Sequence, residues 1–419
     1  MEKIPIYSAF PYFYSVSAKR RNTVRYVIRM MDDIDGDALR RAVDTAFLRY
    51  PYLKVRYCSN RKEGWLEPND ADIVVVNSDK AVTLSSEESN YQLVALGYKD
   101  NNIIMYSFHG LFDGRGRAAL LRTLLYYYCT FRYGETVTMD NVNLVDTPID
   151  PAEYEDPLHK KIILTLKIHS LPVLNPMRLQ RMGMVSPGHF TVHCLKIPED
   201  SFIRWCKQND ATPNTAVALL MSRVIASVHP DPREKICAGV CCDLRPAVDA
   251  PKTHFSLIQW AHLIFDNDLF RKDFQTQCTA VRGQLTLQSD LDSLKGMAIF
   301  IQKVANPITR FPSLAVKKIV SRGIMSFSYR SMTFGVSYSG KLSFGSCGEH
   351  IRGLYAEPDT FGLGMVIEIC VADGYVLLDI MQEWEEDVYL NAFLAQLEAI
   401  GMDIVDAYKG PAQYPPISL

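Results

Sequence analysis

The stretch His109-Gly-Leu-Phe-Asp-Gly114 lies in an otherwise apolar part of the chain and holds residue types that can move a proton. A histidine with an ordinary pKa of about 6.5 is the natural general base at neutral pH, because alcohols and amines lose a proton as they attack. To act in this way, His109 must face a cavity and keep one ring nitrogen unprotonated. Gly110 and Gly114 bracket the turn and allow backbone angles that other residues resist.

The spacing leaves two roles open for Asp113. It could orient His109, as the acid of a catalytic triad does. It could instead pair with an arginine and brace the loop, so that the histidine acts by itself. The three residues between His109 and Asp113 in a tight loop do not favour direct contact between the two side chains.

The flanking residues predict a strand-to-helix loop at the motif. Residues 102–108 are rich in β-branched and aromatic side chains and indicate a strand. Residues 115–134 predict a helix that ends at Gly134, because its apolar positions fall on one helical face: Ala118, Leu121, Leu125 and Tyr128. Ligands of α/β proteins gather at such strand ends.

The rest of the chain predicts an α/β fold with two lobes, each of which alternates strands and helices in a similar way. The first lobe, residues 1–150, has further strands at 23–31, 53–58, 71–77 and 91–99 and a helix that stops at Pro51. Frequent prolines mark residues 151–187 as a crossover linker. The second lobe, residues 188–419, has the following expected elements: strands at 189–197, 235–244, 255–265, 330–345 and 364–382, and helices at 199–210, 212–228, near 270–320 and from about Asp387.

Length and composition agree with two domains. The chain has 419 residues, beyond the roughly 250–300 at which single cores stop growing. A formal charge of −2 gives no sign of nucleic-acid binding. The N-terminus lacks the features of a signal peptide, and no apolar run of about 18 residues occurs. We expect a cytoplasmic monomer with no stable membrane insertion.

Neither the cysteines nor the histidines predict a metal site. The chain has ten cysteines but no Cys-x-x-Cys pair, and Cys237, Cys241 and Cys242 lie in an apolar strand, where reduced buried thiols are expected. His189 and His193 share one face of a strand but have no third ligand at a convincing spacing.

Residues 293–348 contain no acid and carry eight basic residues: Lys295, Lys303, Arg310, Lys317, Lys318, Arg322, Arg330 and Lys341. This tract predicts either a solvated helix face or a lip that attracts phosphate, such as the nucleotide end of coenzyme A or a phosphopantetheine. A membrane surface is a third interpretation.

Several motifs together resemble the superfamily related to chloramphenicol acetyltransferase. The stretch from His109 to Gly114, followed at once by a long apolar helix, looks like that superfamily's His-x-x-x-Asp-Gly motif. The helix, proline and strand at 39–57, the helix at 212–226 and the strand ending in Asp-Leu-Arg-Pro at 243–246 are similar to other family elements. The resemblance covers most of the chain. The superfamily includes peptide condensation domains, plant BAHD acyltransferases, polyketide-associated acyltransferases and alcohol acetyltransferases.

The resemblance implies two α/β lobes with mixed sheets in a V around a central tunnel, and transfer of an acyl group from a thioester to an alcohol or amine. His109 would be the general base, Asp113 a structural support with Arg245 as its ion-pair partner, and Gly114 the turn residue. Residues 336–340 stand where relatives have a turn, so Ser337, Tyr338 and Ser339 would bind substrate, with a hydroxyl or backbone donor for the oxyanion. The co-substrate would be acyl-CoA or an acyl-carrier protein with its phosphopantetheine thioester; no metal or permanently bound cofactor is implied.

Departures from the family patterns narrow the resemblance. Position 108 is Phe, where condensation domains usually carry another histidine, and the BAHD signature Asp-Phe-Gly-Trp-Gly is missing. The free-standing alcohol acetyltransferases and the polyketide-associated type therefore resemble this chain best. Two alternatives stay open: a non-catalytic member that binds a thioester or carrier protein, and a stand-alone peptide condensation enzyme.

Overall fold

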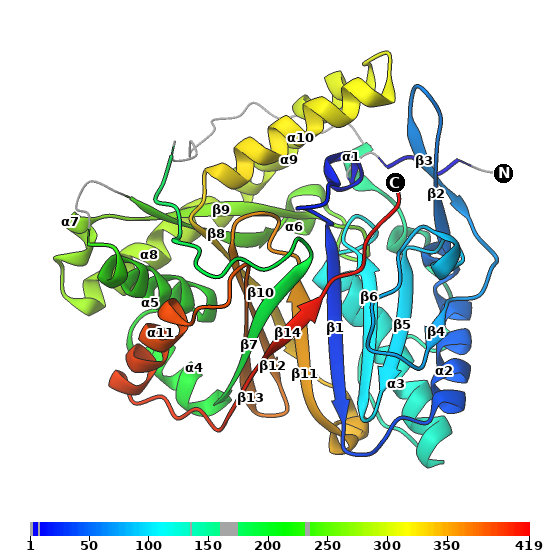
Figure 1. Cartoon of the computed structure of the whole chain (residues 1–419), viewed down its shortest axis with the longest axis horizontal. Helices are drawn as coiled ribbons and strands as arrows, with labels where there is room; N and C mark the ends of the chain where they lie inside the picture. The colour runs from blue at the N-terminus through cyan, green and yellow to red at the C-terminus, as the bar shows by residue number, and fades with distance from the viewer. Residues whose placement is uncertain (1–2, 7–8, 135, 160–174, 231–234) are drawn as a thin grey trace.

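A computed structural model describes residues 3–6, 9–134, 136–159, 175–230 and 235–419. Two mixed β-sheets lie side by side, and each packs helices against its own hydrophobic core (Figure 1). The predicted two-lobed α/β fold with mixed sheets is confirmed.

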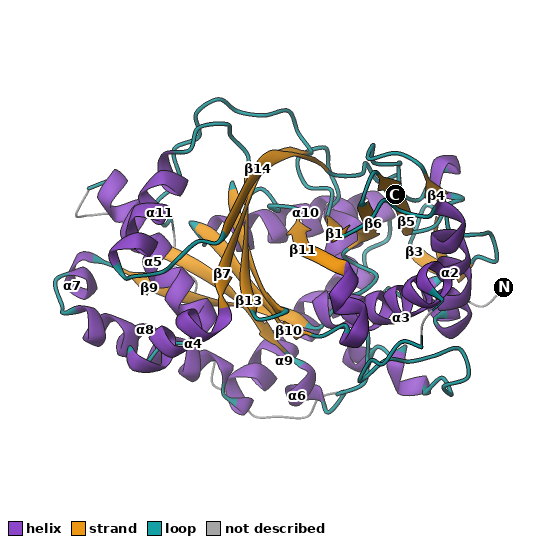
Figure 2. Ribbon diagram, turned by 90° about the horizontal axis from the view of Figure 1, so that it is seen from below, coloured by secondary structure: helices purple, strands orange, loops and turns teal. Residues whose placement is uncertain are grey.

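The first sheet has the strand order β11-β1-β6-β5-β4. Its strands are β1 (Thr23–Met30), β4 (Val75–Val76), β5 (Val94–Lys99), β6 (Asn102–Phe108) and β11 (Ile351–Pro358). Helices α2 (Gly36–Arg49) and α3 (Gly114–Tyr133) pack on each other beside this sheet (Figures 1 and 2). A separate hairpin, β2 (Val55–Ser59) and β3 (Gly64–Pro68), and the short helix α1 (Phe10–Ser15) complete this part of the molecule.

The second sheet has the strand order β14-β7-β13-β12-β10-β8-β9. Its strands are β7 (His189–Pro198), β8 (Ile236–Asp243), β9 (Ile258–Phe265), β10 (Phe334–Leu342), β12 (Met365–Ala372), β13 (Tyr375–Gln382) and β14 (Asp406–Gln413). Its helices are α4 (Glu199–Gln208), α5 (Pro213–Val228), α6 (Arg245–Val248), α7 (Asn267–Phe270), α8 (Phe274–Ser289), α9 (Leu291–Thr309), α10 (Leu314–Arg330) and α11 (Val388–Ala399). In Figure 1, α9 and α10 lie along the top of the molecule, and α10 packs against α1 of the first lobe.

One strand does not follow the lobe boundaries expected from sequence. Strand β11 falls in the range 188–419, yet it pairs antiparallel with β1 and becomes an outer strand of the first sheet. This pairing covers an edge of β1 that would otherwise present unpaired backbone groups. The sequence did not predict β11, β3 or β14, because none of them has a strong alternation of apolar and polar residues.

The strand predicted at 330–345 is confirmed as β10, and the turn that the resemblance implied at 336–340 is wrong. These residues belong to strand β10, which pairs in parallel with β12 and has an irregular register between Tyr338 and Gly340. A β-bulge of this kind bends a strand without ending it and turns its side chains toward a site. Part of the expected crossover linker, residues 160–174, lies outside the described residues.

Candidate active site

His109 lies immediately after β6 and before α3, at the strand end where the sequence predicts a loop. Its backbone N–H donates to the carbonyl of Asn22, 2.7 Å away, and its side chain is only 6% exposed. The ring of Tyr12 stacks on the imidazole at 4.8 Å, and Phe361 meets it edge-on at 5.6 Å. Aromatic rings therefore fix the plane of the histidine.

Burial keeps His109 neutral. It lowers the pKa of the imidazole to about 4, and the nearby charge of Arg117 acts in the same direction. Within the described chain, Nδ1 of His109 has no hydrogen-bond partner. No carboxylate of the described residues thus bonds Nδ1 as in a triad, but a neutral imidazole at neutral pH has an unprotonated nitrogen that can take a proton.

Asp113 makes its contacts elsewhere. Its Oδ1 caps α3 by accepting from the amides of Arg115 and Gly116, at 3.1 and 3.2 Å. The same carboxylate accepts from the guanidinium of Arg245 at 2.9 Å and from the amide of Leu257 at 3.1 Å. The side chains of Asp113 and Arg245 are each 2% exposed, so this is a buried ion pair between the two lobes.

Arg245 is held by several groups besides Asp113. It donates to the carbonyls of Thr253 and Phe255 at 3.0 Å and pairs with Asp243 at 3.0 Å. Asp113 and Arg245 therefore fasten the start of α3 to the end of β8. This contact fixes the position of His109 relative to the second sheet.

Gly114 is the first residue of α3 rather than part of a strained turn, and neither Gly110 nor Gly114 has a positive φ. The expected need for unusual backbone angles is wrong. Both positions are glycine because a larger side chain would come too close to neighbouring atoms. A Cβ on Gly114 would lie 3.2 Å from Oγ of Ser339, and one on Gly110 would overlap the ring of Phe108. Phe108 itself packs in the core against Phe13, ring to edge at 4.7 Å.

A cavity of about 430 Å³ brings His109 together with the second lobe. Among the predicted site residues, it is lined by His109, Asp113, Gly114, Arg245, Ser337, Tyr338 and Ser339. Tyr338 is 37% exposed and lies toward the outside. The bulge of β10 thus brings its two serines to the wall of the cavity that holds His109.

Sequence reasoning missed several charged residues of this cavity, among them Glu368 and Arg117. Glu368 is buried on β12 and accepts a 2.5 Å hydrogen bond from the hydroxyl of Ser339; burial raises the pKa of this carboxyl. Arg117 is buried on α3 and donates to Oγ of Ser107 and to the carbonyl of Phe112. One signal for Glu368 was available: it is the single acid in the fully buried strand Met365–Ala372.

Two further pockets share walls with this cavity. The first, which we call the α10 mouth, has a volume of about 440 Å³ and shares Tyr329 and Phe361 with the cavity. Its described lining includes one acid, Glu383, and six lysines and arginines: Lys19, Arg20, Arg178, Arg181, Arg322 and Arg330. Two residues of the acid-free tract, Arg322 and Arg330, therefore reach a pocket wall.

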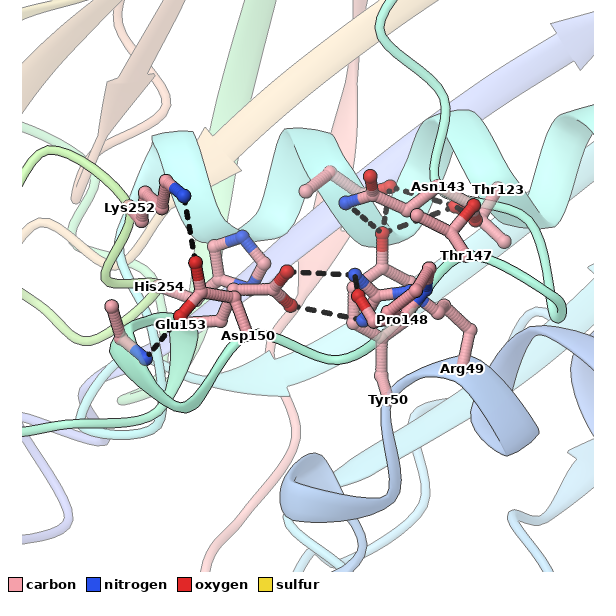
Figure 3. A network of polar contacts seen from close by, with 12 residues as sticks. Arg49, Tyr50, Thr123, Asn143, Thr147, Pro148, Asp150, Glu153, Lys252 and His254 are labelled. Atoms are coloured by element: carbon pink, nitrogen blue, oxygen red, sulfur yellow. Dashed lines mark hydrogen bonds and ion pairs between the residues drawn. The ribbon is translucent and has the colours of Figure 1, made fainter.

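The second pocket, which we call the α3 mouth, has a volume of about 750 Å³ and shares Arg115 and Arg122 with the cavity. It is lined by α3, by residues 141–153 and by residues 251–254. Figure 3 shows part of its wall, a network that includes Arg49, Asp150, Glu153, Lys252 and His254. Each of these two pockets therefore adjoins the cavity that holds His109.

The described residues include no group of three or more side chains suited to hold a metal ion. No described helix combines the length and the apolar character needed to cross a membrane. All ten cysteines are free thiols.

Comparison with known proteins shows which solved structures share this fold. No protein-family model matches the sequence, and no curated protein matches it either. Solved structures do match over nearly the whole chain. Polyketide synthase associated protein 5 from Mycobacterium tuberculosis has 14% identity and a TM-score of 0.59, and the match covers 94% of this chain and 98% of that one.

Two other matches have a similar extent. TRI101 of F. graminearum, in complex with coenzyme A and deoxynivalenol, has 10% identity, a TM-score of 0.58 and coverage of 95% and 97%. The epimerization domain from the third module of tyrocidine synthetase B has 12% identity, a TM-score of 0.58 and the same coverage. The chain therefore shares its two-lobed fold with these three proteins, as its sequence resemblance implied.

Proposed function

We propose that the protein is an acyltransferase that moves an acyl group from a thioester to an alcohol or amine, with His109 as the general base. The observation that carries this proposal is a neutral, buried histidine in a cavity that shares lining residues with two further pockets. The fold supports the class, because TRI3 trichothecene 15-O-acetyltransferase from Fusarium sporotrichioides shares it.

In the proposed reaction, the acceptor's O–H or N–H faces the free nitrogen of His109. As the imidazole takes the proton, the acceptor attacks the thioester carbonyl and forms a tetrahedral oxyanion. Collapse of this intermediate breaks the carbon–sulfur bond, and the leaving thiolate takes the proton from the imidazolium. The histidine returns to its neutral form, so the atoms and charges balance with no covalent enzyme intermediate.

Ser337 and Ser339 are the proposed donors for the oxyanion. The hydroxyl proton of Ser339 is already directed to Glu368. It becomes free for the oxyanion only when Glu368 is protonated and donates to Ser339 in return. Hydrogen-bond donors aimed at developing charge inside a cavity are worth about 2.7–4 kcal/mol each in acyl transfer. The side chain of Ser337 also hydrogen-bonds to Glu368, so the same condition applies to it.

The α10 mouth is the proposed entry for the thioester donor. Coenzyme A and phosphopantetheine both carry phosphate, and arginines bind phosphate in a bidentate manner. Among the described residues, the six cations of this mouth stand against one carboxylate, and Arg330 makes no side-chain ion pair. The neighbour TRI101 binds coenzyme A, which supports coenzyme A as the donor's carrier group.

The decisive experiment measures thiol release by the purified protein with acyl-CoA donors of several chain lengths and with alcohol and amine acceptors. His109→Ala should lower the rate by about 10²–10⁴, the usual effect of a lost general base. Its unfolding midpoint should stay close to the wild-type value. Full turnover in this variant would remove the catalytic assignment, and thiol release absent with all donors would favour a protein that only binds thioesters.

A further inference from the structure

The α3 mouth has carboxylates, but each already has a partner. Glu153 accepts from the two terminal guanidinium nitrogens of Arg49, at 2.9 and 2.7 Å (Figure 3). It also accepts from the hydroxyl of Tyr52 at 2.8 Å. Asp150 pairs with Lys252 at 2.7 Å, as Figure 3 also shows. These acids are thus neutralised within the wall and do not repel an anion.

Arg122 is the cation of this mouth that lacks such a partner. It lies on α3 in the wall between the mouth and the catalytic cavity, and it is half-buried. Within the described part of the chain it has no ion pair or hydrogen bond, and Tyr50 is the one side chain with a noticeable charge effect on it. A partly desolvated charge without a partner is costly, and a bound anion would remove that cost.

Arg115 adds a second cation at the same boundary. Its guanidinium is exposed and lies 3.4 Å from Asp243, a carboxylate that also pairs with Arg245 at 3.0 Å. Asp243 is therefore shared between two arginines. Part of the positive charge of Arg115 is left available to a ligand.

The positions of the two basic mouths indicate which kinds of donor and acceptor would bind. Both mouths that adjoin the catalytic cavity are basic. The proposed reaction brings one phosphate-bearing donor, which needs one of them. A basic mouth is then left for the acceptor.

We propose that the acyl acceptor is itself an anion, a hydroxy- or amino-compound that carries a carboxylate or phosphate, and that Arg122, with Arg115, binds this charge. The inference rests on the proposed acyltransferase function. The acceptor's charged group lies in the α3 mouth, and its O–H or N–H extends past Arg122 toward His109. The charged group is not acylated; it fixes the orientation of the nucleophile.

Matched pairs of small molecules test this directly. Calorimetry with the full chain compares glycerol 3-phosphate with glycerol, and 3-hydroxybutyrate with 3-hydroxybutyramide. The first pair reports on a phosphate and the second on a carboxylate. In at least one pair the anion should bind at least about tenfold more tightly, because a hydrogen bond to a charged group is the stronger kind. If neither anion binds in preference to its neutral partner, the inference is wrong.

Substitutions test whether Arg122 is the residue that binds the anion. Arg122→Gln should abolish the preference for the anion, and Arg122→Lys should restore part of it, because lysine keeps the charge but not the planar fork. Arg132→Gln, on the last turn of the same helix, is the matched control and should keep the preference. A preference that survives in Arg122→Gln would assign the anion to another site and overturn the proposal.

A fragment of the donor tests whether the donor binds in the α10 mouth and the acceptor in the α3 mouth. Adenosine 3′,5′-bisphosphate, the nucleotide end of coenzyme A, should bind more weakly to Arg330→Gln than to the wild type and equally well to Arg122→Gln. The preferred anion should still bind when this fragment is present. Competition between the two ligands would show that they share one mouth and would refute the assignment.

These binding measurements do not depend on turnover, so the two proposals can fail separately. If thiol release depends on His109 but neutral and anionic acceptors bind alike, the acyltransferase proposal stands and the anionic acceptor does not. If an anion binds through Arg122 but thiol release is absent, the binding site stands and the acyltransferase proposal does not.

Discussion

Replacing Asp113 by asparagine tests the claim that this residue braces the two lobes. The substitution keeps the shape of the side chain but leaves one acceptor oxygen in place of two. If the amide oxygen stays on the α3 cap, its NH2 group faces the amide of Leu257 and one guanidinium nitrogen of Arg245. Both of these groups are donors, so two buried hydrogen bonds are lost at once.

The size of the effect follows from burial. Removing one partner of a buried ion pair costs about 3–5 kcal/mol. Asp243 stays within 3.0 Å of Arg245 and retains part of the pairing, and asparagine is still a good N-cap. We expect a loss of about 3 kcal/mol in the free energy of unfolding, at the lower end of that range.

Urea unfolding, followed by fluorescence and circular dichroism, measures this loss. The control is Asp243→Asn, because that side chain is 41% exposed and an exposed pair contributes about 1 kcal/mol or less. Thiol release should also fall in Asp113→Asn, since the start of α3 and His109 shift together. A change below about 0.5 kcal/mol, or an equal effect of both substitutions, would refute the bracing role.

Two further predictions concern His109 and Gly116. With an alcohol acceptor, kcat/KM should stay constant between pH 5.5 and 8, because the His109 pKa of about 4 keeps the base deprotonated over that range. A histidine with an ordinary pKa would lose about tenfold between pH 7 and 5.5, and such a decline would contradict the assignment. Gly116→Ala should destabilise the protein by about 1–3 kcal/mol in thermal unfolding, because its Cβ would overlap the backbone carbonyl of His254 across the lobe interface. Gly283→Ala, on the exposed side of α8 with open space around it, should instead stabilise by about 1 kcal/mol, so equal effects would exclude the close-approach explanation.

The sequence by itself determined the helices, strands and loops that depend on residues close to one another in the chain. The strand Asn102–Phe108, the loop at His109 and the helix Gly114–Tyr133 follow from apolar periodicity and from Gly134, which ends the helix with a positive φ. The same is true of α5, which begins at a capping box formed by Thr212 and Thr215. Periodicity and capping act within a few residues, so they can be predicted from the chain alone.

Tertiary structure decided which distant residues meet. Strand β11 joins β1 across more than three hundred residues of sequence, and Glu368 faces the cavity of His109 only because β10 and β12 pair there. The two basic mouths likewise combine residues from separate parts of the chain, such as Arg20 with Arg330 and Arg122 with Lys252. The sequence alone indicates a base and the class of its reaction. The charge that surrounds His109, and with it the proposed kind of acceptor, depends on long-range packing that no local pattern encodes.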